Sequence, residues 1–270
     1  MGNIPSETKK IKFNVISSKD DATILLNDAE KIDMYLEECN DDVSNYRARK
    51  NCNYICENIS LHEQKYTHSF LESVQENIPL RLRNELTEVN IIQLMTSAEG
   101  GMPHTRPGNI ICYPSISRLY SVSTLVHELW HIHQRNNKEL WTKVFNKLGW
   151  YEWDGKLPSE LEKYRRYNPD TIDCPLWIFE DKWIPIPIFS DITKPDISQV
   201  IIWFYNPHKK QRVQEIPPEI LTYFGDLPKV AFEHPREITA YMLADYEQHK
   251  ETVACKRLLE EIGHISVVSR

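Results

Sequence analysis

His127-Glu128-Leu129-Trp130-His131 has the HExxH pattern, in which one helix offers two imidazoles to a zinc ion and a carboxylate to the water bound there. Residues four apart lie one helical turn above each other, so His127 and His131 can reach the same ion while Glu128 lies at its edge. The pattern therefore predicts a site for one zinc ion, with the two histidines as ligands and Glu128 as general base. No other pattern in the chain is as specific.

The residues around this stretch predict a helix that is packed into a core. One broad arc of the helix is apolar and contains Leu125, Val126, Leu129, Trp130 and Ile132. The two histidines and the glutamate share the remaining side. The simpler alternative is an amphipathic helix whose polar stripe holds these three residues by coincidence, and the spacing favours the metal site over it.

The composition is that of a globular protein. The chain has 270 residues, 41% of them hydrophobic and 26% charged, which is enough for a substantial core. A net charge of −7 without a long basic run argues against nucleic acid as a partner. The sequence contains neither an apolar stretch of membrane-spanning length nor a secretory signal, so we expect a cytosolic protein with its six cysteines reduced.

The N-terminus suggests a lipid modification. Met1-Gly2-Asn3-Ile4-Pro5-Ser6 fits the pattern for myristoylation of Gly2 after removal of Met1. One acyl chain beside Lys9 and Lys10 would give only weak, reversible membrane association. The alternative is a disordered start in which the second residue is glycine by chance.

Patterning along the chain predicts an α+β fold, with a small mixed sheet and a central HExxH helix after a mainly helical N-terminal region. We expect residues 1–75 to form that region, with a flexible start, and residues 76–270 to form the main domain. Helices are expected at 27–39, 60–77, 79–86, 123–148, 159–167, 217–224, 235–249 and 252–262, and strands at 89–95, 109–113 and 199–205, with an extended edge segment at 176–188.

A third ligand is needed, because catalytic zinc sites use three protein ligands and leave the fourth position to water. The metzincin continuation requires Gly three residues after His131 and His three residues further on. The chain has Gln134 and Asn137 there, which excludes that class. A glutamate from a later segment is then the leading option.

Glu152, Glu160 and Glu237 are the candidates for this ligand. Glu237 is favoured because Ala240 and Ala244 lie on the same helix face, so that small residues would let this helix approach the HExxH helix closely. The alternative for Glu237 is a solvated carboxylate in the first turn, where the helix dipole favours it.

Tyr241 shares this face and would point towards the same ion. Its phenol could donate a hydrogen bond to the oxyanion that forms when water attacks a carbonyl, so we predict a catalytic role for it. Packing in the core is the alternative.

Three segments of the sequence resemble uncharacterised zincin-like metallopeptidases of the gluzincin kind. They are Thr124–Arg135, Asn168–Thr171 and Glu233–Tyr241, and the resemblance covers approximately residues 90 to 250. The chain lacks both the Gly-Ala-Met-Glu-Asn exopeptidase motif and the Asn-Glu-x-x-Ser-Asp third-ligand motif of thermolysin-like enzymes, so the resemblance identifies no substrate.

The resemblance implies an α+β zincin domain with His127, His131 and Glu237 as zinc ligands and Glu128 as general base. It also implies a peptide or protein as substrate, hydrolysed by a zinc-activated water.

Other residues are expected to bind substrate or support the ligands. Zincins often present substrate along an edge strand, so residues 109–113 are the candidate for binding an extended peptide by strand addition. His104 and Arg106 lead into this strand and are predicted to bind the oxyanion or a substrate carboxylate, or else to be polar surface. Asn168 and Asp170 either hold a ligand imidazole by its other nitrogen, at the substrate site, or form an Asx turn.

The sequence is compatible with three functions. The first is a zinc-dependent peptidase, and the second is a hydrolase of another amide or ester on the same site. The third is an interaction protein that keeps the zincin scaffold without peptidase activity, attached to a membrane through Gly2. The intact Glu128 argues against the third, because a base that holds no structure together would be lost first from a decaying site.

Overall fold

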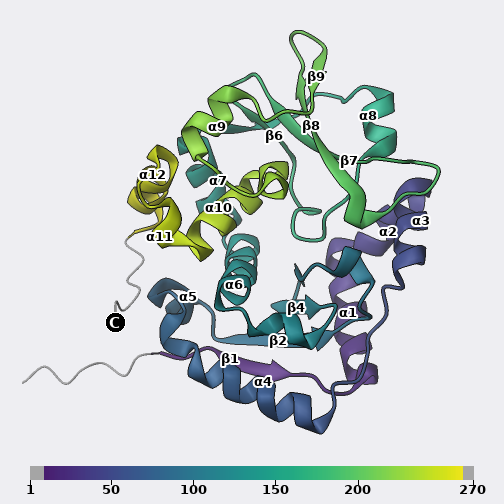
Figure 1. Cartoon of the computed structure of the whole chain (residues 1–270), viewed down its shortest axis with the longest axis vertical. Coiled ribbons are helices and arrows are strands. Elements are labelled where there is room, and N and C mark those ends of the chain that lie inside the picture. Colours follow the sequence, from purple (N-terminus) through teal and green to yellow (C-terminus); the bar gives the residue numbers. More distant parts are fainter. Residues whose placement is uncertain (1–8, 264–270) are drawn as a thin grey trace, which may run out of the picture.

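The structure is a computed structural model that describes residues 9–263, except for the side chain of residue 118 (Figure 1). Its helices are α1 (Lys19–Asp33), α2 (Tyr35–Asp41), α3 (Val43–Cys52), α4 (Leu61–Ser73), α5 (Leu80–Glu85), α6 (Val122–Asn136), α7 (Lys138–Lys147), α8 (Ser159–Tyr164), α9 (Pro218–Phe224), α10 (Pro235–Ala244), α11 (Tyr246–His249) and α12 (Val253–Ile262). Its strands are β1 (Lys12–Val15), β2 (Glu88–Gln93), β3 (His104–Arg106), β4 (Ile110–Tyr113), β5 (Trp150–Trp153), β6 (Leu176–Phe179), β7 (Ile184–Phe189), β8 (Val200–Asn206) and β9 (Gln211–Val213). The predicted α+β class with small sheets is confirmed.

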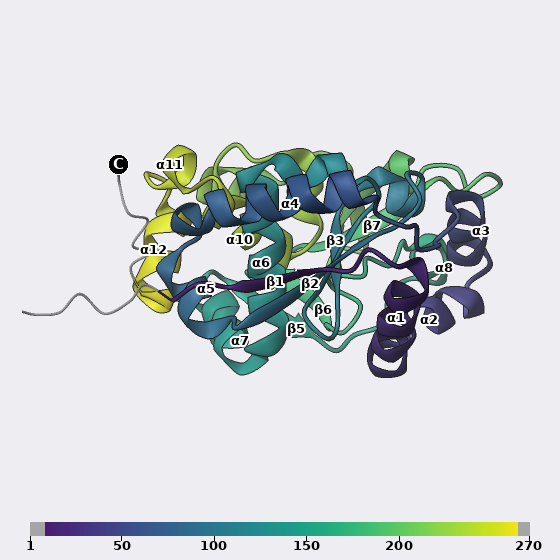
Figure 2. The same ribbon diagram turned by 90° about the horizontal axis from the view of Figure 1, so that it is seen from below.

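A four-stranded mixed sheet is covered by helices on both faces. Its order is β1-β2-β4-β3, with parallel pairs except for the antiparallel pair of β3 and β4. Strand side chains alternate between faces, so Ile91 of β2 joins one hydrophobic cluster and Ile92 joins another. Leu26 of α1 lies in the cluster of Ile92, whereas α4, which runs alongside β1, and α6 contribute to the cluster of Ile91 (Figure 2).

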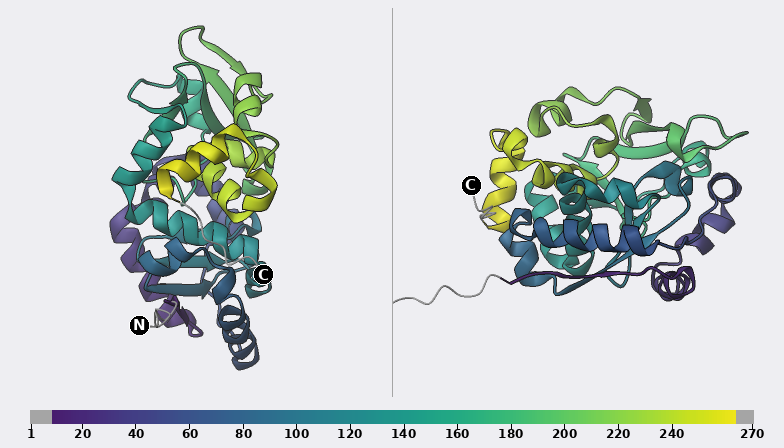
Figure 3. Two further views of the ribbon diagram at one scale, coloured as in Figure 1. Left: turned by 90° about the vertical axis from the view of Figure 1, so that its left-hand side faces the viewer. Right: turned by 60° about the horizontal axis from the view of Figure 1, so that its bottom comes forward.

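The remaining strands lie on the other side of the molecule. β5 pairs with β6, and β7, β8 and β9 form an antiparallel sheet in this order. Figure 1 shows α6 and α10 between this sheet and the four-stranded one, and Figure 3 shows the same separation from two other sides. The two helices α6 and α10 therefore lie between the four-stranded sheet and the sheet of β7, β8 and β9.

Strand β1 was not expected from the sequence. It has only four residues, and two of them, Lys12 and Asn14, are polar. The apolar pattern is therefore too short to predict a strand. Residues 12–15 pair in parallel with residues 88–91, so both sides of the predicted boundary at 75/76 share one sheet.

The helix predicted over residues 123–148 is divided, which is a correction. Asn137 leaves the helical conformation at φ −125°, ψ 48°, between α6 and α7. Its side-chain Nδ2 donates to the carbonyl of His133 at 3.0 Å, and such local side-chain bonds compete with a continuing helix. The helix also begins earlier than expected, because Ser121 caps it.

Two other predicted helices are divided for local reasons. The segment predicted at 235–249 changes direction at Asp245, which has φ −114° and ψ 44°. Residues 27–39 are split at Met34, whose left-handed φ of 50° separates α1 from α2. Apolar spacing gave no sign of either position, because it continues across them.

Candidate metal centre

Helix α6 carries both histidines of the HExxH stretch on the side that faces α10, with His131 buried and His127 partly exposed. The Ser121 hydroxyl accepts a hydrogen bond from the backbone N–H of Thr124 at 3.2 Å and so starts the helix. Fully buried Leu125 and Leu129 belong to the core and fix the rotation of the helix about its axis. The side chain of His131 is 1% exposed as a result.

Helix α10 brings Glu237 to these histidines. His234 caps the helix, its Nδ1 accepting from the backbone N–H of Arg236 at 3.1 Å, and Pro235 occupies the first position, where no N–H is needed. Glu237 lies in the first turn, and the small, fully buried Ala240 follows one turn later. The close packing of α10 on α6 is as the spacing of Ala240 predicted.

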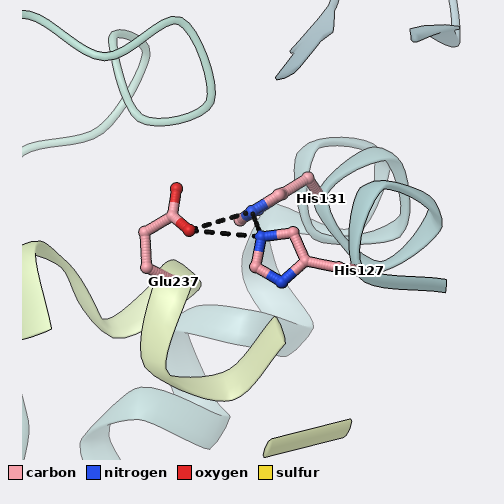
Figure 4. A group of neighbouring side chains, drawn as sticks. All are labelled: His127, His131 and Glu237. Atoms are coloured by element: carbon pink, nitrogen blue, oxygen red, sulfur yellow. Dashed lines mark hydrogen bonds and ion pairs between the residues drawn. The ribbon is translucent and has the colours of Figure 1, made fainter. Parts of the chain in front are cut away.

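Three potential ligand atoms converge between the two helices (Figure 4). The distance between His127 Nε2 and His131 Nε2 is 2.9 Å, and Glu237 Oε2 is 3.3 Å from each of them. Around an ion with bonds of about 2.0 Å, the edge of a ligand tetrahedron is about 3.3 Å. The separations and the donor set of two imidazoles and one carboxylate therefore fit a zinc ion.

The other two glutamates that the sequence left open lie on the surface. Glu152 is an exposed residue of β5, opposite Trp177 of β6, and Glu160 is exposed on α8. Within the described residues, the group of His, Cys, Asp and Glu side chains close enough to hold an ion contains Glu237 and neither of these.

Opposite pKa shifts distinguish the two glutamates of the centre. Burial by itself would raise the pKa of Glu237, but the charge of His131 and hydrogen bonds from both histidines bring it well below its usual range. Burial, followed by the negative charge of Asp170, raises the pKa of Glu128 well above its usual range. Glu237 is thus suited to be an anionic ligand, and Glu128 to be a stronger proton acceptor.

Glu128 and Tyr241 both line the cavity at the histidines. Glu128 is 3% exposed, and among the described residues its Oε2 atom has no hydrogen-bond partner. The Tyr241 ring lies edge-on against the His127 imidazole, with 4.5 Å between ring centroids and 70° between planes. Tyr241 is therefore placed beside a potential ligand and at the cavity, and its role as an oxyanion donor stays a prediction.

This cavity has a volume of about 270 Å³ and two kinds of wall. Charged and polar side chains from α6, α10 and the segment before β6 form part of the lining. The apolar part consists mainly of Met102, Ile197, Val200, Ile202 and Val230. The cavity therefore offers an apolar surface next to groups that could carry out hydrolysis.

Asn168 supports the carboxylate of the centre instead of an imidazole. Its Nδ2 donates to Glu237 Oε1 at 3.1 Å, and its Oδ1 accepts from the backbone N–H of Asp170 at 2.9 Å, which closes an Asx turn. Asp170 accepts in turn from the backbone N–H of Thr105 at 2.7 Å and from its hydroxyl at 2.5 Å. Both residues line the cavity, but neither accepts a hydrogen bond from a ligand imidazole.

Arg106 does not line the cavity, which corrects its prediction as a substrate-binding residue. Its buried guanidinium donates to Asp33 at 2.7 and 2.8 Å and to Glu30 at 2.8 Å, so it ties β3 to α1. His104 does line the cavity, yet it is 2% exposed and its Nε2 is 2.8 Å from the hydroxyl of Tyr54.

The prediction that residues 109–113 bind a peptide by strand addition is wrong. Residues 110–113 form β4, which is paired with β2 on one side and β3 on the other. On this side the edge strand of the sheet is β3. The backbone N–H of Thr105 donates to the carboxylate of Asp170, and the backbone carbonyl of Thr105 accepts from Arg135 at 3.3 Å. The outward backbone groups of Thr105 therefore already have partners.

Gln134 is a functional candidate that sequence reasoning missed. Its Oε1 is 2.9 Å from Nδ1 of His131, and its Nε2 donates to the carbonyl of Arg236 and to the hydroxyl of Thr239, both at 3.0 Å. It orients a potential ligand and joins α6 to α10. Its position three residues after His131, on the same helix face, was the available signal.

A buried ion network behind Glu237 was also missed. Arg166 lies 3.3 Å from both Glu99 and Glu233, and Asn168 donates to Glu233 as well as to Glu237. These residues come from separate segments, so no spacing in the sequence could have indicated the network.

Replacing Gln134 by Ala is expected to weaken zinc binding roughly 10–100-fold, the usual effect of losing a partner that orients a ligand. The change removes the hydrogen bond that fixes the His131 ring. Zinc affinity would be measured by competition with a chelator. Asn136→Ala, on the exposed side of the same helix, should bind zinc as the wild type does. Equal loss in both variants would contradict the assignment.

Asp173 joins the segment before β6 to three basic residues, at 2.7 Å from Arg236, 3.3 Å from Arg135 and 2.8 Å from Lys138. Burial alone would raise the pKa of Asp173, but the charges of Arg236 and Arg135 hold it below its ordinary value. Because the folded-state pKa is the lower one, the stabilisation is present above about pH 4, the pKa of an unfolded Asp, and is lost as the pH falls below it.

Asp173→Asn is therefore expected to lower the free energy of unfolding by roughly 2–4 kcal/mol at neutral pH, near the lower end of the effect of breaking a buried ion pair. The difference from wild type should shrink below about pH 4, because Asp173 of the unfolded wild-type chain then binds a proton while the carboxylate of the folded chain is still ionised. Urea denaturation at a series of pH values measures both the loss of unfolding free energy and its dependence on pH. Exposed Asp154→Asn serves as control, and a difference that stays constant down to pH 2 would contradict this account.

Gly2 lies outside the described residues, so its lipidation stays a prediction. Within residues 9–263, no helix combines the length and the apolar composition needed to cross a bilayer.

Comparison of the chain with models of protein families, with curated proteins and with solved structures found no match.

Proposed function

We propose that this chain is a zinc-dependent metallopeptidase with a zincin-like α+β domain. One observation carries the proposal. His127 and His131 of the HExxH helix and Glu237 of α10 hold three potential ligand atoms within 4.8 Å of one another, and Glu128 lies beside them in the cavity wall.

His127, His131 and Glu237 would hold the ion. Zinc bound there would supply Lewis acidity, which lowers the pKa of a coordinated water and polarises a carbonyl. Gln134 supports this arrangement, because by accepting a hydrogen bond from Nδ1 of His131 it leaves the Nε2 lone pair for the ion.

Glu128 would act as both general base and general acid. It accepts a proton from the water that attacks the scissile carbonyl and then delivers this proton to the leaving amine. Its raised pKa makes the Glu128 carboxylate a stronger proton acceptor than an exposed glutamate. Tyr241, against His127 at the cavity, is the proposed hydrogen-bond donor to the oxyanion.

The apolar wall of the cavity would accept a substrate side chain next to the scissile bond. Ile197 and Ile202 are almost fully buried, and Val230, at 50% exposure, lies at the rim. Such a wall favours an apolar residue over a charged one at this position.

A second candidate, hydrolysis of a small amide or ester, is favoured by one feature. The backbone groups of Thr105 at the sheet edge are occupied by Asp170 and Arg135, so a long peptide cannot pair with them. A substrate of that kind would use the same residues and the same cavity.

The test is metal-dependent hydrolysis. Purified protein would be stripped with a chelator, reloaded with zinc, and incubated with a proteome-derived peptide library and a panel of small amides and esters. We expect new peptide termini, seen by mass spectrometry, with the zinc-loaded protein and not with the stripped one. Zinc-dependent turnover of only the small substrates would favour the second candidate. A zinc-loaded protein that cleaves nothing in either set would contradict both.

A further inference from the structure

Behind the cavity of the metal centre lies a second, smaller one of about 30 Å³. Arg166, Asn168 and Glu233 belong to the walls of both. The rest of its wall comes from the segment before β6, from β6 and β7, and from His234 at the start of α10. Its volume suffices for one small guest.

Three buried N–H groups belong to side chains in this wall. They are Arg166 Nε, Trp177 Nε1 and His234 Nε2, in residues that are 5%, 3% and 8% exposed. Among the described residues, none of these atoms has a hydrogen-bond partner. Leaving such a group unpaired in a protein interior costs about 1–3 kcal/mol, so one cavity with three of them is unusual.

His234 is a donor on this side. Its Nδ1 accepts the backbone N–H of Arg236 at 3.1 Å, so the hydrogen of the neutral ring is on Nε2. Burial, followed by the charge of Arg236, lowers the pKa of His234 to about 3, which keeps the ring neutral. Arg166 Nε and Trp177 Nε1 can only donate.

The guest must therefore accept several hydrogen bonds. A water molecule has two lone pairs and would leave one of the three donors without a partner, whereas a monatomic anion can accept from all three.

We propose that this cavity is a binding site for a monovalent halide, chloride being the abundant one, held by Arg166, Trp177 and His234. The site is separate from the metal ligands and does not depend on the proposed hydrolysis. The cavity is nevertheless in contact with the surroundings of the metal ligands. Arg166 contacts Glu233 at 3.3 Å, and His234 caps the helix that carries the ligand candidate Glu237.

Bromide provides the direct test, because it replaces chloride and scatters X-rays anomalously. Crystals of the full chain, grown with bromide as the halide, should show an anomalous peak in the cavity between Trp177 and His234. Density there without an anomalous signal would identify water and overturn the proposal.

A second test separates the site from general salt effects. The thermal midpoint of the zinc-loaded protein would be followed as bromide replaces gluconate at constant ionic strength, and it should rise to a plateau. Trp177→Phe removes one donor from an ionic guest and should weaken the apparent affinity roughly tenfold or more.

The matched control is Trp150→Phe. The Nε1 atom of Trp150 is likewise buried and has no partner among the described residues, but it does not line this cavity. Its variant should keep the wild-type bromide response. A response that rises linearly without a plateau, or one that Trp177→Phe leaves unchanged, would overturn the proposal whether or not the protein proves to be a hydrolase.

Discussion

Glu128→Gln is expected to lower turnover roughly 10³–10⁴-fold while zinc stays bound at one ion per chain. Glutamine has the size of glutamate but cannot accept the proton of the attacking water. Glu128 is outside the group of potential ligands, so its replacement leaves the three ligand atoms in place. Turnover would be measured on the best substrate from the library, and zinc by elemental analysis.

Glu139→Gln is the matched control for this experiment. Glu139 lies on α7, close in sequence to the HExxH helix, and is exposed, so its variant should retain full activity. Wild-type turnover by zinc-loaded Glu128→Gln would rule out Glu128 as the base. Loss of zinc from this variant would instead mean that Glu128 is a ligand.

Glu237→Ala is expected to weaken zinc binding by roughly 10³-fold or more. It removes one of three ligands, which is a larger loss than the roughly 10–100-fold effect of an outer partner. The two histidines would remain 2.9 Å apart, with no carboxylate to complete the site. Competition with a chelator gives the affinity, and the thermal midpoint of the metal-free form shows whether the packing of α10 survives.

Glu152→Ala is the control for this second change, since Glu152 was an alternative ligand from the sequence and is exposed on β5. It should bind zinc as the wild type does. Zinc retained by Glu237→Ala and lost by Glu152→Ala would reverse the ligand assignment.

The parts of the centre that could be predicted depend on local spacing. HExxH is one turn of one helix, and Glu237 was favoured because Ala240 lies one turn beyond it on the same face. Both signals come from helix periodicity, which the sequence displays directly. Neither required knowledge of which segments meet.

The parts that failed depend on contacts between distant segments. Arg106 was expected at the substrate site because it is a cation near the strand, but Asp33, more than seventy residues earlier, holds it in the interior. Residues 109–113 were expected at an edge because nothing in their own sequence reveals that β3 pairs beside them. Strand order and ion-pair partners are set by the whole fold, so single-sequence patterns do not contain them.

The distance along the chain between the two parts of the centre has a consequence for the life of the protein. Glu237 follows His131 by more than one hundred residues, and the two meet only when α10 packs on α6. On the proposed function, a chain still being synthesised, or one that has lost this packing, lacks a complete ligand set. Hydrolytic capacity would then belong to the native state alone, and misfolded copies could not digest themselves or their neighbours.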